Sequence, residues 1–182
     1  MIKQITVAGF GGQGVMLLGQ TLAHAGNEVG LHTLWFPSYG PETRGGTANC
    51  GVTIADEKIN SPVFSKADTL IALNEPSLEK FKEKVKENGE IIYNASLITK
   101  AVKIEKLKIY PIPANEIAVE LGNIRVANMV MLGAYLALHD DISLSEIIDS
   151  LTAIFGERRK HLITINIKAL EKGMECITSL KS

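Results

Sequence analysis

Cysteine is scarce in this sequence, and its scarcity limits the metal chemistry open to the chain. The only two cysteines, Cys50 and Cys176, lie far apart and belong to no CxxC pattern or cysteine–histidine pairing. Several such ligands must converge to hold a zinc ion or an iron–sulfur cluster. We therefore predict that this chain alone binds no metal and that its thiols are reduced.

Neither sign of charge is in excess, and long apolar runs are missing. The chain carries 19 basic and 20 acidic residues, so it lacks the broad positive field that holds a nucleic-acid backbone or an anionic membrane. No stretch reaches the length of a membrane-spanning helix, and the first residues, MIKQITVAGF, lack the apolar core of a secretory signal. We expect a cytoplasmic protein with no nucleic-acid or membrane partner.

What is present is the pattern of one α/β domain. The 182 residues, 46% of them hydrophobic, suit a single domain spanning residues 1–182. Ile5 to Ala8 form a short apolar run that ends in glycines, and Val15 to Ala25 follow with helical spacing. Thr47 to Ala55 have the period-two pattern of a strand with two unlike faces. The sequence predicts an α/β, doubly-wound-like fold, in which a mostly parallel sheet has helices on both faces and at least one antiparallel strand or hairpin.

Proline and glycine predict two element boundaries. The second strand, His32 to Phe36, is expected to end at Pro37 because proline cannot donate to a strand ladder. The lysine- and glutamate-rich stretch from Ser77 to Glu87 is expected to form one exposed amphipathic helix, ended by Asn88 and Gly89. Both boundaries follow from local sequence alone.

A glycine-rich motif follows the first strand. Its six residues, GFGGQG from Gly9 to Gly14, satisfy the GxGxxG spacing between a strand and a helix. Positions without side chains let backbone N–H groups approach an anion, and the helix amino terminus adds partial positive charge. The alternative is that the glycines only permit a tight turn and close packing of helix on strand. A nicotinamide cofactor is disfavoured, because the segment from Leu34 to Pro37 lacks the carboxylate that would hold its ribose.

A second loop, SYGPETRGG from Ser38 to Gly46, is the more unusual motif. Prolines stiffen it, and its glycines permit positive φ. In a right-handed βαβ unit it emerges at the same carboxyl edge of the sheet as the glycine motif. Arg44 could pair there with a phosphate or a carboxylate. Equally, Glu42 and Arg44 could pair with each other or with a neighbouring subunit.

Other polar residues are predicted to be structural. His24, His32 and His139 have no carboxylate or cysteine at ligand or dyad spacing. Asn128 lies in an apolar helical pattern and needs a hydrogen-bond partner, for which we expect a loop backbone. No serine–histidine–aspartate arrangement or carboxylate pair is evident, so no catalytic residue is predicted.

The two motifs together resemble the gamma subunit of 2-oxoacid:ferredoxin oxidoreductases. They read GFGGQGVMLLGQTLAHAG from Gly9 to Gly26 and FPSYGPETRGGTANCGVTIAD from Phe36 to Asp56. In that family a GxGGQG turn and an SYGPExRGG loop occur in this order. LIALNEP, from Leu70 to Pro76, and VANMVMLGA, from Val126 to Ala134, are also similar to the family, so the resemblance spans most of the chain.

The resemblance implies an enzyme that decarboxylates a 2-oxoacid on thiamine diphosphate, sends electrons through iron–sulfur clusters to ferredoxin and passes the acyl group to coenzyme A. It implies that thiamine diphosphate, magnesium and the clusters belong to partner alpha, beta and delta subunits, and that this chain lies near the coenzyme A path. The loop form is closer to 2-oxoglutarate versions than to pyruvate versions. Pyruvate, branched-chain and indolepyruvate versions stay open, as do a stand-alone, Rossmann-like nucleotide- or flavin-binding module and a dimer of the isolated chain.

The resemblance also transfers a set of motif positions, without a catalytic acid, base or nucleophile among them. We expect these residues to shape a subunit interface and an anion site. They are Gly9, Gly11, Gly12, Gln13, Gly14, Ser38, Tyr39, Gly40, Glu42, Arg44 and Gly45.

Overall fold

The computed structural model describes residues 1–38 and 47–182, with a six-stranded sheet at the centre. The strands are β1 (Ile2–Phe10), β2 (His32–Ser38), β3 (Thr47–Ala55), β4 (Ala67–Ala72), β5 (Val85–Asn94) and β6 (Lys108–Ile112). Their order across the sheet is β2-β3-β1-β4-β5-β6. β3 runs antiparallel to both of its neighbours, and the remaining pairs are parallel. The predicted fold class, mostly parallel with an antiparallel strand, is confirmed.

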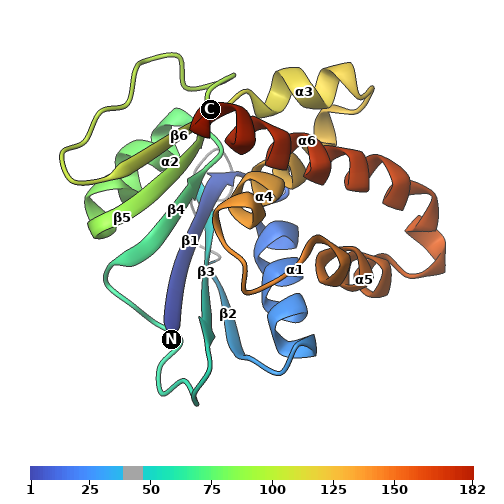
Figure 1. Ribbon diagram of the computed structural model, residues 1–182, viewed down its shortest axis with the longest axis horizontal. Coiled ribbons are helices and arrows are strands. Elements are labelled where there is room, and N and C mark those ends of the chain that lie inside the picture. Colours follow the sequence, from blue (N-terminus) through green and yellow to red (C-terminus); the bar gives the residue numbers. More distant parts are fainter. Residues whose placement is uncertain (39–46) are drawn as a thin grey trace.

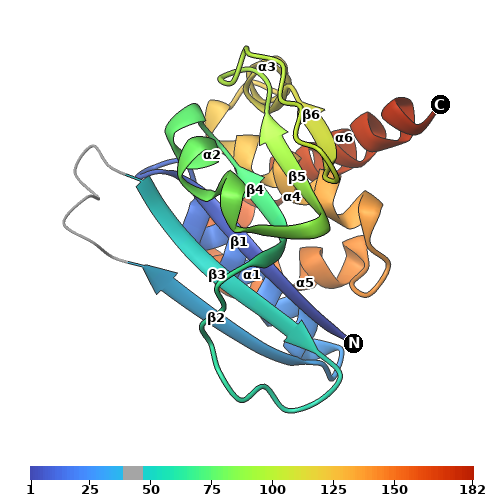
Figure 2. The same cartoon turned by 90° about the vertical axis from the view of Figure 1, so that its left-hand side faces the viewer.

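Helices cover the two faces of this sheet unevenly. They are α1 (Val15–Glu28), α2 (Glu75–Phe81), α3 (Ala114–Glu120), α4 (Ala127–Leu138), α5 (Leu144–Phe155) and α6 (Ile163–Lys181), with short 3₁₀ turns η2 (Lys82–Lys84), η3 (Ile124–Val126) and η4 (Glu157–Leu162). All but α2 contribute to the core on one face, and α2 packs on the other (Figure 1). Figure 2 shows that the opposite side of β2 and β3 carries no helix from the described part of the chain. Helices therefore lie on both faces, as predicted, but the helices of the described residues leave the β2 and β3 half of one face uncovered.

Side chains of the inner strands alternate between the two faces of the sheet and contribute to a hydrophobic core on each face. Leu70 and Ile91 face the α2 side, whereas the next residues, Ile71 and Ile92, face the side of α1 and α4. Successive side chains of a strand point to opposite faces of the sheet. Because both faces are covered at β4 and β5, both sets of side chains are apolar there.

Helices α4 and α6 cross in backbone contact at two glycines. A Cβ atom at Gly133 would lie 2.0 Å from the carbonyl oxygen of Leu170, and one at Gly173 would lie 1.9 Å from that of Val130. Neither position has room for a side chain. This contact explains why α4 is apolar on nearly all sides. The sheet covers one side of α4, and α6 packs on the side that faces away from the sheet. Across residues 1–38 and 47–182, none of the helices combines the length and the apolar character that crossing a bilayer requires.

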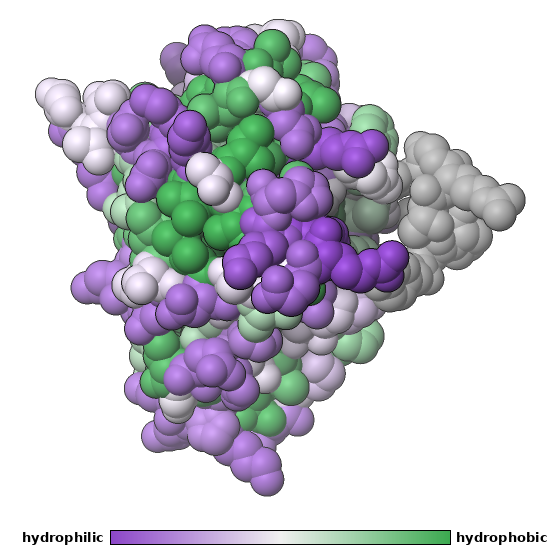
Figure 3. Space-filling view, turned by 90° about the vertical axis from the view of Figure 1, so that its right-hand side faces the viewer, coloured by the Kyte–Doolittle hydropathy of each residue, from purple (hydrophilic) through white to green (hydrophobic). Residues whose placement is uncertain are grey.

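The outer side of the helical layer has a mixed surface. Figure 3 views the molecule from the side of α5 and the start of α6, where apolar surface borders charged surface. Ile148, Ile154 and Ile165 are only partly buried there, and the Arg159 guanidinium lies 4.9 Å from the centre of the Phe155 ring. Partly exposed apolar residues of this kind are ordinary at the rim of an amphipathic helix.

Strand β2 continues through Pro37 to Ser38, so its predicted end before Pro37 is wrong. β2 lies at the edge of the sheet, where β3 is its neighbour. An edge strand tolerates proline because one side of its backbone needs no strand partner. The rule that proline ends a strand holds for central strands, and it does not apply to β2 because β2 is an edge strand.

The predicted helix from Ser77 to Glu87 is wrong over its second half. α2 ends at Phe81, and β5 begins at Val85. Asn88, with a φ of 64°, and Gly89 do not end a helix but lie within β5, where its pairing with β4 shifts register. A strand with extra residues relative to its partner, as at a β-bulge, favours residues that accept positive φ at that point. The asparagine–glycine pair that was predicted to end a helix is therefore part of a strand irregularity.

A buried polar cluster closes the amino end of the parallel strands. Lys3 on β1 pairs with Asp141, and His139 Nε2 lies 2.5 Å from Glu90 Oε1. Thr69 Oγ1 donates to the same Glu90 oxygen at 2.8 Å. The Lys3, Asp141, His139 and Glu90 side chains are between 9 and 23% exposed. His139 thus has a carboxylate partner, Glu90, that its sequence spacing did not predict. Because His139 and Asp141 lie in the connection between α4 and α5, the cluster also holds this connection against the sheet.

Replacing Lys3 with methionine is expected to lower the free energy of unfolding by about 2 kcal/mol, because the buried Asp141 carboxylate then has no cation beside it. Asp141 is 9% exposed, and its Oδ2 has no hydrogen-bond partner among the described residues. Urea denaturation measures the loss. The double variant Lys3→Met, Asp141→Leu should recover most of it, since an apolar pair replaces the ion pair. A single variant as stable as the parent chain would contradict this account.

Candidate functional site

The glycine motif forms the turn between β1 and α1, at the carboxyl end of the parallel strands. Gly12 and Gly14 adopt φ values of 88° and 76°, in the left-handed region that favours glycine. Gly14 immediately precedes α1. No side chain of the described residues caps that helix end, and its first turn carries no acidic residue. Within the described part of the chain, this helix start therefore suits an anion.

Gln13 holds the turn closed from inside. Its Oε1 accepts a hydrogen bond from the Phe10 backbone N–H at 2.6 Å and one from the Asn74 side-chain amide at 2.9 Å. Gly9 permits this close approach, since a Cβ atom there would lie 2.8 Å from Gln13 Oε1. The oxygen of Gln13 thus orders the turn and ties it to the end of the neighbouring strand.

Asn128, at the start of α4, braces the turn from the helical side. Its Nδ2 donates to the Gly14 carbonyl at 3.1 Å, which confirms the predicted bond to a loop backbone. A Cβ atom at Gly14 would lie 2.2 Å from Asn128 Nδ2. Gly14 is therefore required twice, once by its positive φ and once by this contact.

Neutral amides continue along the same edge of the sheet. Asn74 follows β4, Asn94 ends β5 and Asn115 follows β6. Asn94 Nδ2 donates to Asn115 Oδ1 at 2.9 Å and to the Leu73 carbonyl at 3.3 Å. Together with the bond from Asn74 to Gln13, these contacts form a row of amides across the ends of four parallel strands.

This edge offers binding groups rather than reactive groups. Amide side chains and backbone N–H groups do not titrate near neutral pH and are not nucleophiles. Across residues 1–38 and 47–182, no group of three or more histidine, cysteine, aspartate or glutamate side chains could hold a metal ion. The described residues thus do not fit an iron–sulfur cluster or a magnesium site. They suit an interface or an anion-binding surface.

The two thiols are expected to differ sharply in reactivity. Cys50 on β3 is 1% exposed, and burial raises the pKa of its thiol to about 12. Cys176 on α6 is partly exposed, and burial raises its pKa as well. Because the thiolate is the reactive form, iodoacetamide at pH 8 should modify Cys176 slowly and Cys50 only after denaturation, as peptide mass spectrometry can show. Equal modification of both thiols in the folded chain would contradict the burial of Cys50.

The structure gathers part of the predicted site. It places Gly9 near the end of β1 and Gly11, Gly12, Gln13 and Gly14 in the turn that follows. Outside the described residues lie Tyr39, Gly40, Glu42, Arg44 and Gly45.

The first residue of the second motif, Ser38, and the residue after its end, Thr47, lie at the same edge as the glycine turn. Ser38 ends β2 and pairs with Asn49, while Thr47 begins β3 and pairs with Phe10, where the glycine turn starts. The contact of the two motifs with each other stays a prediction.

Comparison with known proteins identifies relatives along nearly the whole chain. Residues 4–176 match the pyruvate ferredoxin/flavodoxin oxidoreductase family. The 2-oxoglutarate synthase subunit KorC of Methanocaldococcus jannaschii is 35% identical over 190 residues, which cover 99% of this chain and 96% of KorC. The gamma subunit of a keto/oxoacid ferredoxin oxidoreductase from Geobacter sulfurreducens has a similar solved structure, with a TM-score of 0.83 and 28% identity over 97% of this chain and 99% of that one.

A further relative is much longer than this chain. The ketoisovalerate oxidoreductase subunit VorA of Methanothermobacter marburgensis is 42% identical over 173 residues, which cover 94% of this chain but 36% of VorA. The chain thus spans about a third of the length of the curated ketoisovalerate relatives that it matches. In those relatives, the matching region is one part of a longer polypeptide.

Proposed function

The chain belongs to the pyruvate ferredoxin/flavodoxin oxidoreductase family, and from that membership we propose that it acts as the gamma subunit of a 2-oxoacid:ferredoxin oxidoreductase. The observation that carries the proposal is the end-to-end match with two subunits, KorC and the Geobacter sulfurreducens gamma subunit. The reaction is the oxidative decarboxylation of a 2-oxoacid to its acyl-coenzyme A, with electrons delivered to ferredoxin.

In this proposal the chain completes the enzyme and does not carry its redox chemistry. The row of amide side chains at the carboxyl edge and the two cysteines on separate elements support that role. Thiamine diphosphate, magnesium and the iron–sulfur clusters would be held by alpha, beta and delta subunits, which are the proposed partners together with ferredoxin. A cytoplasmic hetero-oligomer is part of the same proposal.

The first substrate candidate is 2-oxoglutarate, because the SYGPETRGG loop resembles that version of the enzyme and KorC is a 2-oxoglutarate synthase subunit. A branched-chain 2-oxoacid is the second candidate, because the identity to VorA, at 42%, exceeds the 35% identity to KorC. Purifying the chain with co-expressed partner subunits and measuring kcat/KM for both oxoacids, pyruvate and indolepyruvate tests the choice. We expect 2-oxoglutarate to be preferred, and a preference for 2-oxoisovalerate would replace it with the second candidate.

We also propose that coenzyme A reaches the enzyme beside the glycine turn. The start of α1, which no described side chain caps, fits a phosphate group. Gly11, Gly12, Gly14 and Ser38 would then face the coenzyme, with Arg44 as the predicted cation. Calorimetry of the isolated chain with coenzyme A, NADH and FAD should detect little binding, because the site is shared with partners. Tight binding of FAD or NADH to the chain alone would favour a stand-alone carrier instead.

A further inference from the structure

The polar cluster at the amino end of the parallel strands buries two carboxylates beside one lysine. The Asp141 and Glu90 side chains are 9% and 11% exposed, and among the described residues Lys3 is the one lysine that pairs with either of them. A buried charge without a partner is costly, because the protein replaces the water that would solvate it. His139 is the other member of this cluster that can carry a positive charge.

His139 is placed to neutralise Glu90. Its Nε2 lies 2.5 Å from Glu90 Oε1, and the same oxygen accepts a hydrogen bond from Thr69 Oγ1 at 2.8 Å. The carboxylate form of Glu90 satisfies both donors. The Tyr135 ring packs against the imidazole, with 4.3 Å between the ring centres. The ring of His139 is thus held between a carboxylate and an aromatic side chain.

Two phenols lie within range of the negative charge of this cluster. Burial, followed by the charges of Asp141, Glu90 and Asp68, raises the pKa of Tyr135 well above its ordinary value. Burial and the Glu90 charge raise the pKa of Tyr110 on β6. A second proton on the nearby imidazole would reduce the negative charge to which both phenols are exposed.

The other charged groups around the ring offset one another or face solvent. Lys3 Nζ lies 3.3 Å from His139 Nδ1 and opposes a charge on the ring, but Asp141 pairs with Lys3 and offsets it. Lys108, opposite Glu90 in the register of β5 and β6, is exposed, so water solvates its charge. Further charged groups at this end are exposed or already paired, namely Asp140, Lys86 with Asp68, Lys106 with Glu87, and the Met1 amino group with Asp56.

A hollow of about 460 Å³ gives water access to the cluster. Lys3, Thr69, Glu90 and His139 are among the residues that line it. A proton can therefore reach or leave the imidazole without unfolding of the chain.

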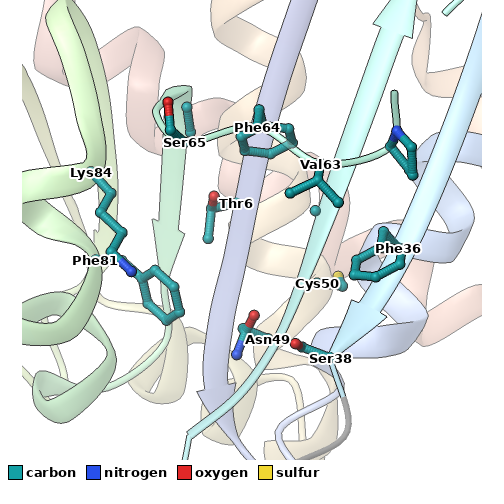
Figure 4. A pocket seen from close by; sticks show the side chains of 13 residues that line it. Thr6, Phe36, Ser38, Asn49, Cys50, Val63, Phe64, Ser65, Phe81 and Lys84 are labelled. Carbon is teal, nitrogen blue, oxygen red and sulfur yellow. The ribbon is translucent and has the colours of Figure 1, made fainter. Parts of the chain in front are cut away.

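A second hollow, of about 390 Å³, lies over β1 and β3 and has a different lining (Figure 4). Phe36, Phe64 and Phe81 line it, and no carboxylate or histidine is among its described lining residues. Burial raises the pKa of Cys50, which also lines it, to about 12. Of these two hollows, the one at the amino end is therefore the one where a histidine titrates, between about pH 5 and 8.

We propose that His139 is a proton-operated clamp, which holds the α4–α5 connection to β5 most tightly when its ring carries the second proton. With that proton the cluster has two cations for its two carboxylates. Without it, Glu90 has only neutral donors among the described residues. The clamp is independent of the proposed function, because it lies at the opposite end of the strands from the glycine turn.

The sign of the pH dependence follows from this charge balance. The folded chain, which presents Glu90 to the ring, binds the proton more tightly than the unfolded chain does. The stability that the clamp adds is therefore present at the acid end of the histidine range and is lost as the pH rises through it.

Urea denaturation of the full chain at intervals from about pH 5.5 to 8 tests the clamp. One proton linked to folding changes the folded-to-unfolded ratio by up to about tenfold per pH unit. Between about pH 6 and 8, the ratio of the parent chain should fall at least about fivefold more than that of His139→Gln. Glu90→Gln keeps the size of the side chain but removes its charge, and it should abolish the same part of the pH dependence.

His24→Gln is the matched control. His24 is also partly buried, but its Nδ1 lies 3.0 Å from the neutral Ser150 hydroxyl, so this variant should keep the pH dependence of the parent chain. Imidazole ¹⁵N NMR of the parent chain needs no variant to fold. At about pH 7, where an ordinary histidine is mostly neutral, both ring nitrogens of His139 should carry a proton. A ring with one proton at that pH, or a His139→Gln chain with the pH dependence of the parent, overturns the clamp.

Discussion

A Gly133→Ala variant is expected to lose at least about 3 kcal/mol of unfolding free energy, a large fraction of the total stability of a domain. The added Cβ would lie 2.0 Å from the Leu170 carbonyl oxygen, and a backbone atom cannot rotate away as a side chain can. Relief requires α4 and α6 to separate, which opens the core between them. Gly173→Ala should have a similar effect through Val130. Urea denaturation followed by circular dichroism measures both losses.

The sign of this effect is diagnostic. In an unconstrained helix, glycine to alanine stabilises by up to about 1 kcal/mol. Glu171→Ala, at an exposed position of the same helix α6, should change stability by less than about 0.5 kcal/mol. A gain in stability for Gly133→Ala would show that the two helices are not in backbone contact.

A Gly14→Ala variant is expected to lower the 2-oxoacid-dependent ferredoxin reduction of the assembled enzyme at least about tenfold. Alanine at a φ of 76° is strained, and its Cβ would collide with Asn128. The turn must move, which shifts the start of α1 and the carboxyl edge that we assign to the coenzyme and the partner. Steady-state assays at saturating and limiting coenzyme A measure the loss.

Gly30→Ala is the matched control for this change. Gly30, at the other end of α1, has a φ of 84°, but a Cβ atom there would meet nothing within 4 Å. It therefore carries the backbone strain without the collision, and we expect assembly and activity to be retained. Equal loss of activity in both variants would mean that general destabilisation, and not the glycine turn, is responsible.

Local patterns predicted the elements whose ends are set by their own residues. The strand predicted from Thr47 to Ala55 has those bounds in the structure, because alternation along one strand is a local property. The helix after Ser143 begins with a capping box, in which Ser143 and Glu146 bond reciprocally, and the spacing of these two residues is likewise a local property. Position in the sheet is not local, and for that reason the ends predicted for the strand from His32 and for the helix from Ser77 were both wrong.

The candidate site could be predicted only where its residues are adjacent in sequence. The glycine turn follows from six consecutive residues, and its brace by Asn128 could be anticipated as a bond to some loop. The row of amides could not, since Asn74 bonds to Gln13 across 61 positions and Asn94 to Asn115 across 21. An asparagine at or just after the end of three successive strands was the available signal, but caps and turns favour the same residue. The pairing of His139 with Glu90 could not be predicted either, because the two residues are 49 positions apart in the sequence.

The most direct test of the central claim is an add-back assay. Thiamine-binding and cluster-bearing subunits are purified without this chain, and 2-oxoacid- and coenzyme A-dependent reduction of ferredoxin is measured as the chain is titrated in. We expect no activity from the chain alone, little from the partners alone, and a rise that saturates at one chain per set of partner subunits. Full activity of the partners without the chain would contradict the account.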